Sequence, residues 1–145
     1  METIYGWLSF LYETDYFPTL AFLQESNLIQ IIGISTLIIA IVVCVVYYYA
    51  LNHTRWNRWW HWLIFLLGVV AISFFLAFGI SHSNLLANDS VWGAIYDRSL
   101  NITTYTVYYA CLGLGFANAF ISIVFFTICS FIIKWGSHNC KHSPF

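Results

Sequence analysis

Histidine and cysteine are the side chains of this sequence suited to metal or haem chemistry, and there are five histidines and four cysteines. A haem held between helices needs two imidazoles that face each other at a similar depth. His61 and His82 lie about 21 residues apart on one predicted helix, which separates them by about 31 Å of helical rise. They cannot ligate one iron, and His61 would meet His138 only at a membrane interface. We therefore predict interfacial or structural histidines and no haem.

The C-terminal tail, residues 136–145, gathers His138, Cys140 and His142 within a short stretch. Zinc prefers four protein ligands in paired spacings, and the tail offers three, so we predict no metal site and no cofactor. A second hypothesis makes these three residues and Phe145 a docking peptide for a cytoplasmic partner, whose pocket would take the Phe145 ring and terminal carboxylate. Pro144 would lower the entropy lost on binding. An ordinary frayed terminus is the alternative.

No catalytic pattern accompanies these residues. The HExxH, GxSxG and P-loop motifs are missing from the sequence. Residues 26–54, 59–88 and 99–133 contain no Asp, Glu, Lys or Arg, which removes the usual markers of proton relays and ion pathways. We predict that the protein is not an enzyme.

The composition indicates an integral membrane protein. Hydrophobic residues make up 61% of the 145 residues and charged residues 8%, whereas soluble domains carry roughly a quarter charged residues. The low charge also excludes the basic patch of a nucleic-acid binder. A helix needs about 20 apolar residues to cross a bilayer, and each uncharged stretch accommodates one. We predict an all-α membrane domain with transmembrane helices at 28–51, 59–80 and 105–135.

The basic residues set the expected orientation. Arg55 and Arg58 lie in the loop 52–58, and Lys134 and Lys141 lie at the end of the third span or after it, so one side of the membrane holds four of the five basic residues. The positive-inside rule makes that side cytoplasmic. We expect a multi-pass protein of a bacterial inner (cytoplasmic) membrane, with its N-terminus outside and its C-terminus inside.

Tryptophans mark the expected cytoplasmic interface, where amphipathic rings are favoured. These anchors are Trp56, Trp59, Trp60, Trp62 and Trp135. A cation–π cage is the alternative interpretation of the first four residues.

Two segments are expected on the outer face. Residues 1–27 contain Ile4, Trp7, Leu8 and Leu11 at helical spacing, which predicts a short amphipathic helix in the outer interface. Residues 81–104 are rich in turn and cap formers and are expected to form the outer loop.

Small and polar residues form a predicted helix–helix interface on the second and third spans. They are Ser73, Ala77, Cys111, Gly115, Asn118, Ala119 and Ser122. Small residues let helix backbones approach closely, and a buried asparagine can hydrogen-bond across helices. These faces either close a three-helix bundle within the chain or contact other subunits.

Three functional hypotheses follow. The first is a non-enzymatic anchor or scaffold subunit of a larger secretion, respiratory or envelope complex, whose partners are the lipid bilayer and other subunits or copies of itself. The second is an oligomeric channel or transport component lined by the third span through Asn118 and Ser122. The third is a small membrane immunity protein.

Overall fold

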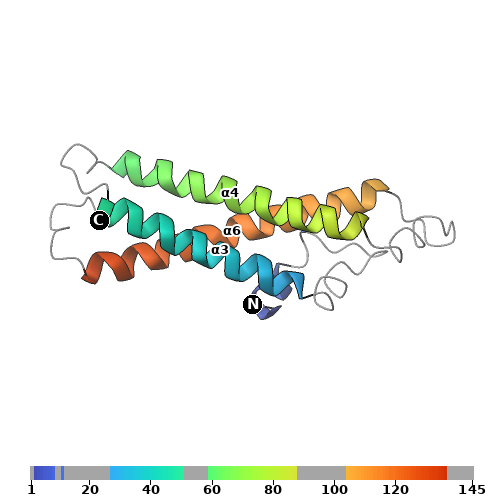
Figure 1. Cartoon of the computed structure of the whole chain (residues 1–145), viewed down its shortest axis with the longest axis horizontal. Helices are drawn as coiled ribbons and strands as arrows, with labels where there is room; N and C mark the ends of the chain where they lie inside the picture. Colours follow the sequence, from blue (N-terminus) through green and yellow to red (C-terminus); the bar gives the residue numbers. More distant parts are fainter. Residues whose placement is uncertain (1, 9–10, 12–26, 51–58, 88–103, 137–145) are drawn as a thin grey trace.

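The computed structural model describes residues 2–8, 11, 27–50, 59–87 and 104–136, and every element among them is helical. The elements are α1 (Glu2–Trp7), α3 (Leu28–Val45), the π-helical turn η2 (Val46–Ala50), α4 (Trp59–Leu86) and α6 (Thr104–Gly136). The helices α3, α4 and α6 run lengthwise beside one another as an elongated bundle, and α1 lies against the bundle near the start of α3 (Figure 1).

Three of these helices are long and apolar enough to cross a membrane. The candidate spans are Leu28–Tyr49, Trp60–Leu85 and Tyr105–Lys134, each longer than the roughly 20 residues that a bilayer requires. The prediction of an all-helical protein with three such helices is confirmed.

Helix α4 continues to Leu86, although the sequence had assigned residues 81–86 to a loop. The polar residues that favoured a loop are accommodated by their own helix. The Ser81 hydroxyl donates to the Ala77 carbonyl (2.7 Å), and the Asn84 amide donates to the Ile80 carbonyl (2.7 Å). Such local bonds allow polar side chains to remain within a helix that their propensity would end.

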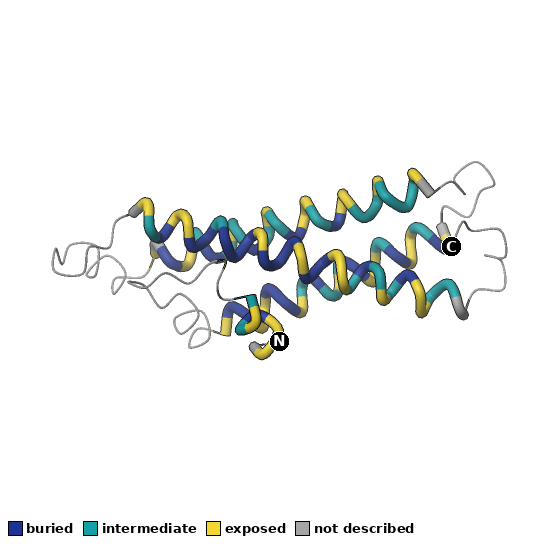
Figure 2. The backbone as a smooth tube through the Cα atoms, turned by 180° about the vertical axis from the view of Figure 1, so that it is seen from behind, coloured by how far each residue is buried: buried dark blue, intermediate teal, exposed yellow. Residues whose placement is uncertain are grey.

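Among the described residues, two hydrophobic clusters of buried side chains lie along the bundle. The first group is Tyr5, Leu28, Ile29, Ile32, Ala77, Leu114, Ala117 and Ile121. The second group, nearer the other end, is Ala40, Cys44, Val69 and Phe126. Burial is denser at the end that contains the first group, as the colouring in Figure 2 shows. Alanine, glycine and serine recur where the helices meet, because small side chains permit close packing of membrane helices.

Helix α1 packs on the bundle through Tyr5, and Leu8, directly after the helix, packs against the first group of buried residues. Tyr5 is completely buried, whereas Ile4, Trp7 and Leu11 of the expected amphipathic face are 44%, 84% and 41% exposed. The position of this segment in a membrane interface stays a prediction.

Candidate functional site

Asn118, in the middle of α6, joins the four main elements of the structure. Its Oδ1 accepts a hydrogen bond from the Tyr5 hydroxyl of α1. Its Nδ2 donates to Thr36 Oγ1 of α3 (3.0 Å) and to the Ser73 carbonyl of α4 (2.7 Å). The Thr36 hydroxyl donates in turn to the Ile32 carbonyl (2.8 Å). We call Tyr5, Thr36, Ser73 and Asn118 the asparagine cluster.

The asparagine cluster lies deep within the candidate spans. Asn118 is about 20 Å of helical rise from Tyr105, the first residue of its span. Thr36, Ser73 and Asn118 are all completely buried. An amide without partners at this depth would cost several kcal/mol. The cluster can therefore fasten α1, α3, α4 and α6 together where no water is available to compete.

Two serines beside the cluster differ in their hydrogen bonding. The Ser122 hydroxyl donates to the Ala119 carbonyl of its own helix (2.7 Å). The Ser73 hydroxyl is buried and has no hydrogen-bond partner within the described part of the chain. Ser73 thus contributes to the cluster through its backbone carbonyl.

Gly115 of α6 lies against the Phe74 ring of α4. A Cβ atom at this position would come within 2.9 Å of the Phe74 ring, a distance that real Cβ atoms essentially never show. That ring is itself held by Phe78, in a stacked arrangement at 6.3 Å, and by Phe116 at 5.0 Å. A larger residue at 115 would therefore displace a packed aromatic side chain.

The aromatic contacts between α4 and α6 continue to His82. Its ring stacks on Phe78 at 5.5 Å and meets the edge of Tyr108 at 6.2 Å. Phe78 and Tyr108 also contact each other edge-on at 5.6 Å. These contacts give His82 a packing role between two helices.

A second polar group, which we call the serine cluster, lies near the other end of the bundle. The Trp62 Nε1 donates to the Ser130 hydroxyl (3.2 Å), which also lies 3.5 Å from the Cys44 thiol. The Cys44 thiol contacts the Phe126 carbonyl (3.6 Å). Cys44, like Cys111 and Cys129, is a free thiol. This cluster links α3, α4 and α6 through weaker donors and acceptors than an amide.

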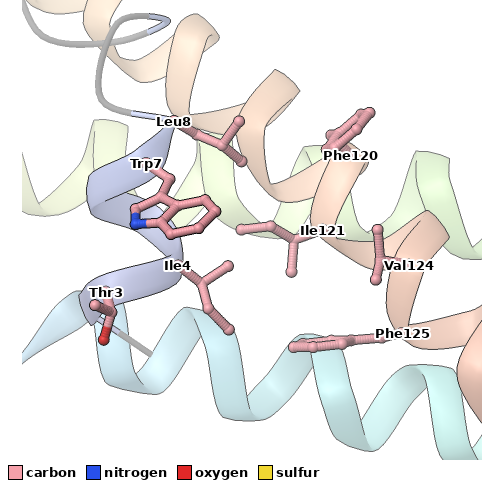
Figure 3. A pocket seen from close by; sticks show the side chains of 8 residues that line it. All are labelled: Thr3, Ile4, Trp7, Leu8, Phe120, Ile121, Val124 and Phe125. Carbon is pink, nitrogen blue, oxygen red and sulfur yellow. The ribbon is translucent and has the colours of Figure 1, made fainter.

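An apolar pocket of about 500 Å³ separates α1 from α6 (Figure 3). Its lining residues are Thr3, Ile4, Trp7, Leu8, Phe120, Ile121, Val124 and Phe125. The side chains of the two helices face each other across this space without filling it. The N-terminal segment therefore contacts the bundle beside this pocket, through Tyr5 and Leu8.

The residues predicted to form a helix–helix interface are all buried within this chain. They are Ser73, Ala77, Cys111, Gly115, Asn118, Ala119 and Ser122. Of the predicted interfacial anchors, Trp60 is 59% exposed and Trp62 belongs to the serine cluster. The other anchors and the tail lie outside the described residues: Trp56, the side chains of Trp59 and Trp135, and His138, Cys140, His142 and Phe145.

Tyr5 and Thr36 were missed from the sequence. Tyr5 lies off the apolar face expected for the N-terminal helix, and 113 residues separate it from Asn118. Thr36 could have been identified by comparing how far each polar residue lies from the middle of its span. Thr36, Ser73 and Asn118 are the polar residues nearest the middle of their three spans. Polar groups at equal depth in hydrocarbon tend to pair with one another.

The described fold is thus a helical bundle in which three helices long and apolar enough to span a membrane are joined by buried hydrogen bonds. Within the described helices and turns, no group of three or more His, Cys, Asp or Glu residues is placed to hold a metal ion. Comparison of the chain with protein-family models, with curated proteins and with solved structures finds no match.

Proposed function

We propose that this protein is a non-enzymatic subunit of a larger membrane complex, in which it anchors a partner helix along the first half of α4. The observation that carries the proposal is the uneven burial of the spans. In its most apolar stretch α4 is 17% buried, compared with 33% for α3 and 39% for α6. From Trp60 to Gly68 of α4, no residue is buried. This half of α4 therefore contributes little to the core of the chain and presents apolar side chains at its surface, among them Ile64 and Leu67.

A groove between α3 and α4 runs along this half. It has a volume of about 320 Å³ and is lined by Val43, Val46, Ile64, Phe65, Gly68, Val69 and Ile72. A Cβ added at Gly68 would meet no atom within 4 Å, so packing within the chain does not require a glycine there. A glycine in a helix interior costs about 1 kcal/mol relative to alanine, and small residues are typical of contacts between membrane helices. The groove thus suits an apolar side chain from a partner helix.

The alternatives draw less support from the geometry. A channel lined by Asn118 and Ser122 would require both side chains to leave the contacts they make within the chain. The immunity-protein hypothesis has no corresponding feature among the described residues. The anchoring hypothesis uses the surface that remains exposed and leaves the asparagine cluster intact.

Photo-crosslinking in intact cells tests this proposal. Benzoylphenylalanine replaces Ile64 or Leu67, each 61% exposed on α4, and, as a matched control, Phe120, which is 57% exposed on α6. We expect a protein adduct of defined mass from the two α4 positions and none from position 120. Equal adduct formation at all three positions, or none at any, would contradict the assignment of α4. An adduct of exactly twofold mass would favour the oligomeric alternative.

For orientation, we propose an N-terminus outside and a C-terminus inside, in a bacterial inner membrane. The support is the sequence bias, in which Arg55, Arg58, Lys134 and Lys141 fall on one side of the three spans. Cysteines introduced at Glu13 and Asn88 should react with an impermeant maleimide in intact cells, and one at Arg55 should not. The reverse pattern would invert the topology.

A further inference from the structure

A pocket of about 270 Å³ opens beside the serine cluster, at one end of the bundle. It is lined by Tyr48 of η2, Trp62 of α4, and Thr127, Ser130, Phe131 and Lys134 of α6. Tyr48, Trp62 and Lys134 each lie within about two residues of the end of a candidate span. The pocket therefore sits where three spans would leave the hydrocarbon and meet the lipid headgroups.

Lys134 supplies the positive charge of this pocket. The other polar groups of its wall are already engaged: the Ser130 hydroxyl accepts from Trp62 Nε1 (3.2 Å), and the Thr127 hydroxyl donates to the Ile123 carbonyl (2.7 Å). The remaining wall is aromatic and apolar. A single ammonium group above an apolar wall complements an amphiphile with one negative headgroup.

We propose that this pocket binds one anionic phospholipid, with its phosphate at Lys134 and its glycerol and upper acyl chain against Phe131 and the Tyr48 ring. The positive charge of Lys134 favours an anionic lipid over a zwitterionic one. A choline or ethanolamine group would bring a second cation close to Lys134. The acidic residue that the described chain contains, Glu2, begins α1, which packs against the opposite end of α3. Among the described residues, no carboxylate lies at this end of the bundle to pair with that cation.

Native mass spectrometry of the full-length, detergent-purified protein tests the site. The protein is incubated with equal amounts of phosphatidylglycerol and phosphatidylcholine that carry the same acyl chains. We expect one tightly retained phosphatidylglycerol, preferred about fivefold over phosphatidylcholine, the effect of one lysine near a membrane surface. Equal retention of the two lipids by the wild-type protein would overturn the proposal.

Four variants test whether the preference for phosphatidylglycerol depends on Lys134 and on this pocket. Lys134→Gln should abolish it and Lys134→Arg should keep it, whereas Lys141→Gln makes the same change of charge seven residues along the sequence and should keep it. Thr127→Phe should fill the pocket and expel the lipid although Lys134 remains. Equal losses in Lys134→Gln and Lys141→Gln, or full retention in Thr127→Phe, would overturn the site. Size-exclusion chromatography checks folding, and if Lys134→Gln does not fold, Thr127→Phe and the wild-type lipid competition decide.

Discussion

The asparagine cluster and the serine cluster both join helices through polar side chains, but they differ in strength. Asn118 has an amide with an acceptor oxygen and a donor nitrogen, and from a completely buried position on α6 it hydrogen-bonds to three other elements. Ser130 offers one hydroxyl to an indole and a thiol, at contacts of 3.2 and 3.5 Å. An amide can satisfy more hydrogen-bonding positions than a hydroxyl, and a thiol is a weak partner. The bundle is therefore fastened most firmly around Asn118.

The burial of side chains also differs between the two halves of α4. On α4, Ser73, Ala77, Ser81 and Leu85 are buried at every fourth position in the half that packs near Asn118. In the other half, Val69 is the buried residue among those described from Trp60 onwards. The α3–α4 groove and the pocket beside Lys134 both lie in this loosely packed half. Burial is therefore denser from the middle of the bundle towards the start of α3 than towards Lys134, where the groove and the pocket lie.

The largest expected effect on stability comes from Asn118→Leu. Leucine is similar in size, so the variant mainly removes hydrogen bonds to three elements. We expect a loss of about 3 kcal/mol, about 1 kcal/mol for each of the three interhelical hydrogen bonds. Unfolding by SDS titration in mixed micelles measures it, with Leu112→Ala as a control on the same helix. A loss no greater than that of the control would remove the asparagine cluster from its central role.

Gly115→Leu should follow, with a loss of about 2 kcal/mol from overpacking. The new side chain must displace the Phe74 ring, which Phe78 and Phe116 hold in place. Gly68→Leu and Gly79→Leu are matched controls, because a Cβ at either position meets no atom within 4 Å. The same SDS titration should show little change for both controls. Equal losses of stability for leucine at all three glycines would show that the contact between Gly115 and Phe74 is no tighter than the surroundings of Gly68 and Gly79.

Much of the fold was predictable because the spans contain no charges. Residues 28–51, 59–80 and 105–135 read as helices from length and apolarity alone, and the structure places long helices in these regions. The predicted C-terminal end of the second helix, residue 80, lies six residues before the observed end of α4. Ser81 and Asn84 hydrogen-bond to their own helix, and composition alone cannot show this. The small residues around Asn118 were visible from their spacing. The contact between Tyr5 and Asn118 was not visible, because it forms only through the tertiary fold.

A smaller effect is expected from Tyr5→Phe, which keeps the ring and removes the hydrogen bond to Asn118. We expect a loss of about 1 kcal/mol, the typical value for one hydrogen bond. Because an unfilled apolar pocket separates the rest of α1 from α6, this loss should release α1 rather than unfold the bundle. Hydrogen–deuterium exchange should rise in residues 2–8 and stay unchanged in α4.

Trp7→Leu provides the matched control for Tyr5→Phe, since Trp7 lies on the same helix and is 84% exposed. It should leave the exchange of residues 2–8 unchanged. Faster exchange in Trp7→Leu than in Tyr5→Phe would show that α1 is held by its apolar face, and the asparagine cluster would then join three elements instead of four.

The smallest effect should come from Ser130→Ala. The variant removes the acceptor of Trp62 Nε1, but the Cys44 thiol keeps its contact with the Phe126 carbonyl, and the half-buried indole lies near the end of its span, where other acceptors are within reach. We expect a loss of about 0.5 kcal/mol in SDS titration, close to the average for a hydrogen bond between membrane helices. Ser122→Ala, which removes a bond within one helix, is the control.

Asn118 and Ser130 are about 18 Å apart along α6, so the losses in the double variant should add. A Ser130→Ala loss as large as that of Asn118→Leu, or strong non-additivity, would mean that the two ends are fastened as one unit. The α4 surface beside the serine cluster would then be as rigidly held as the rest of the bundle.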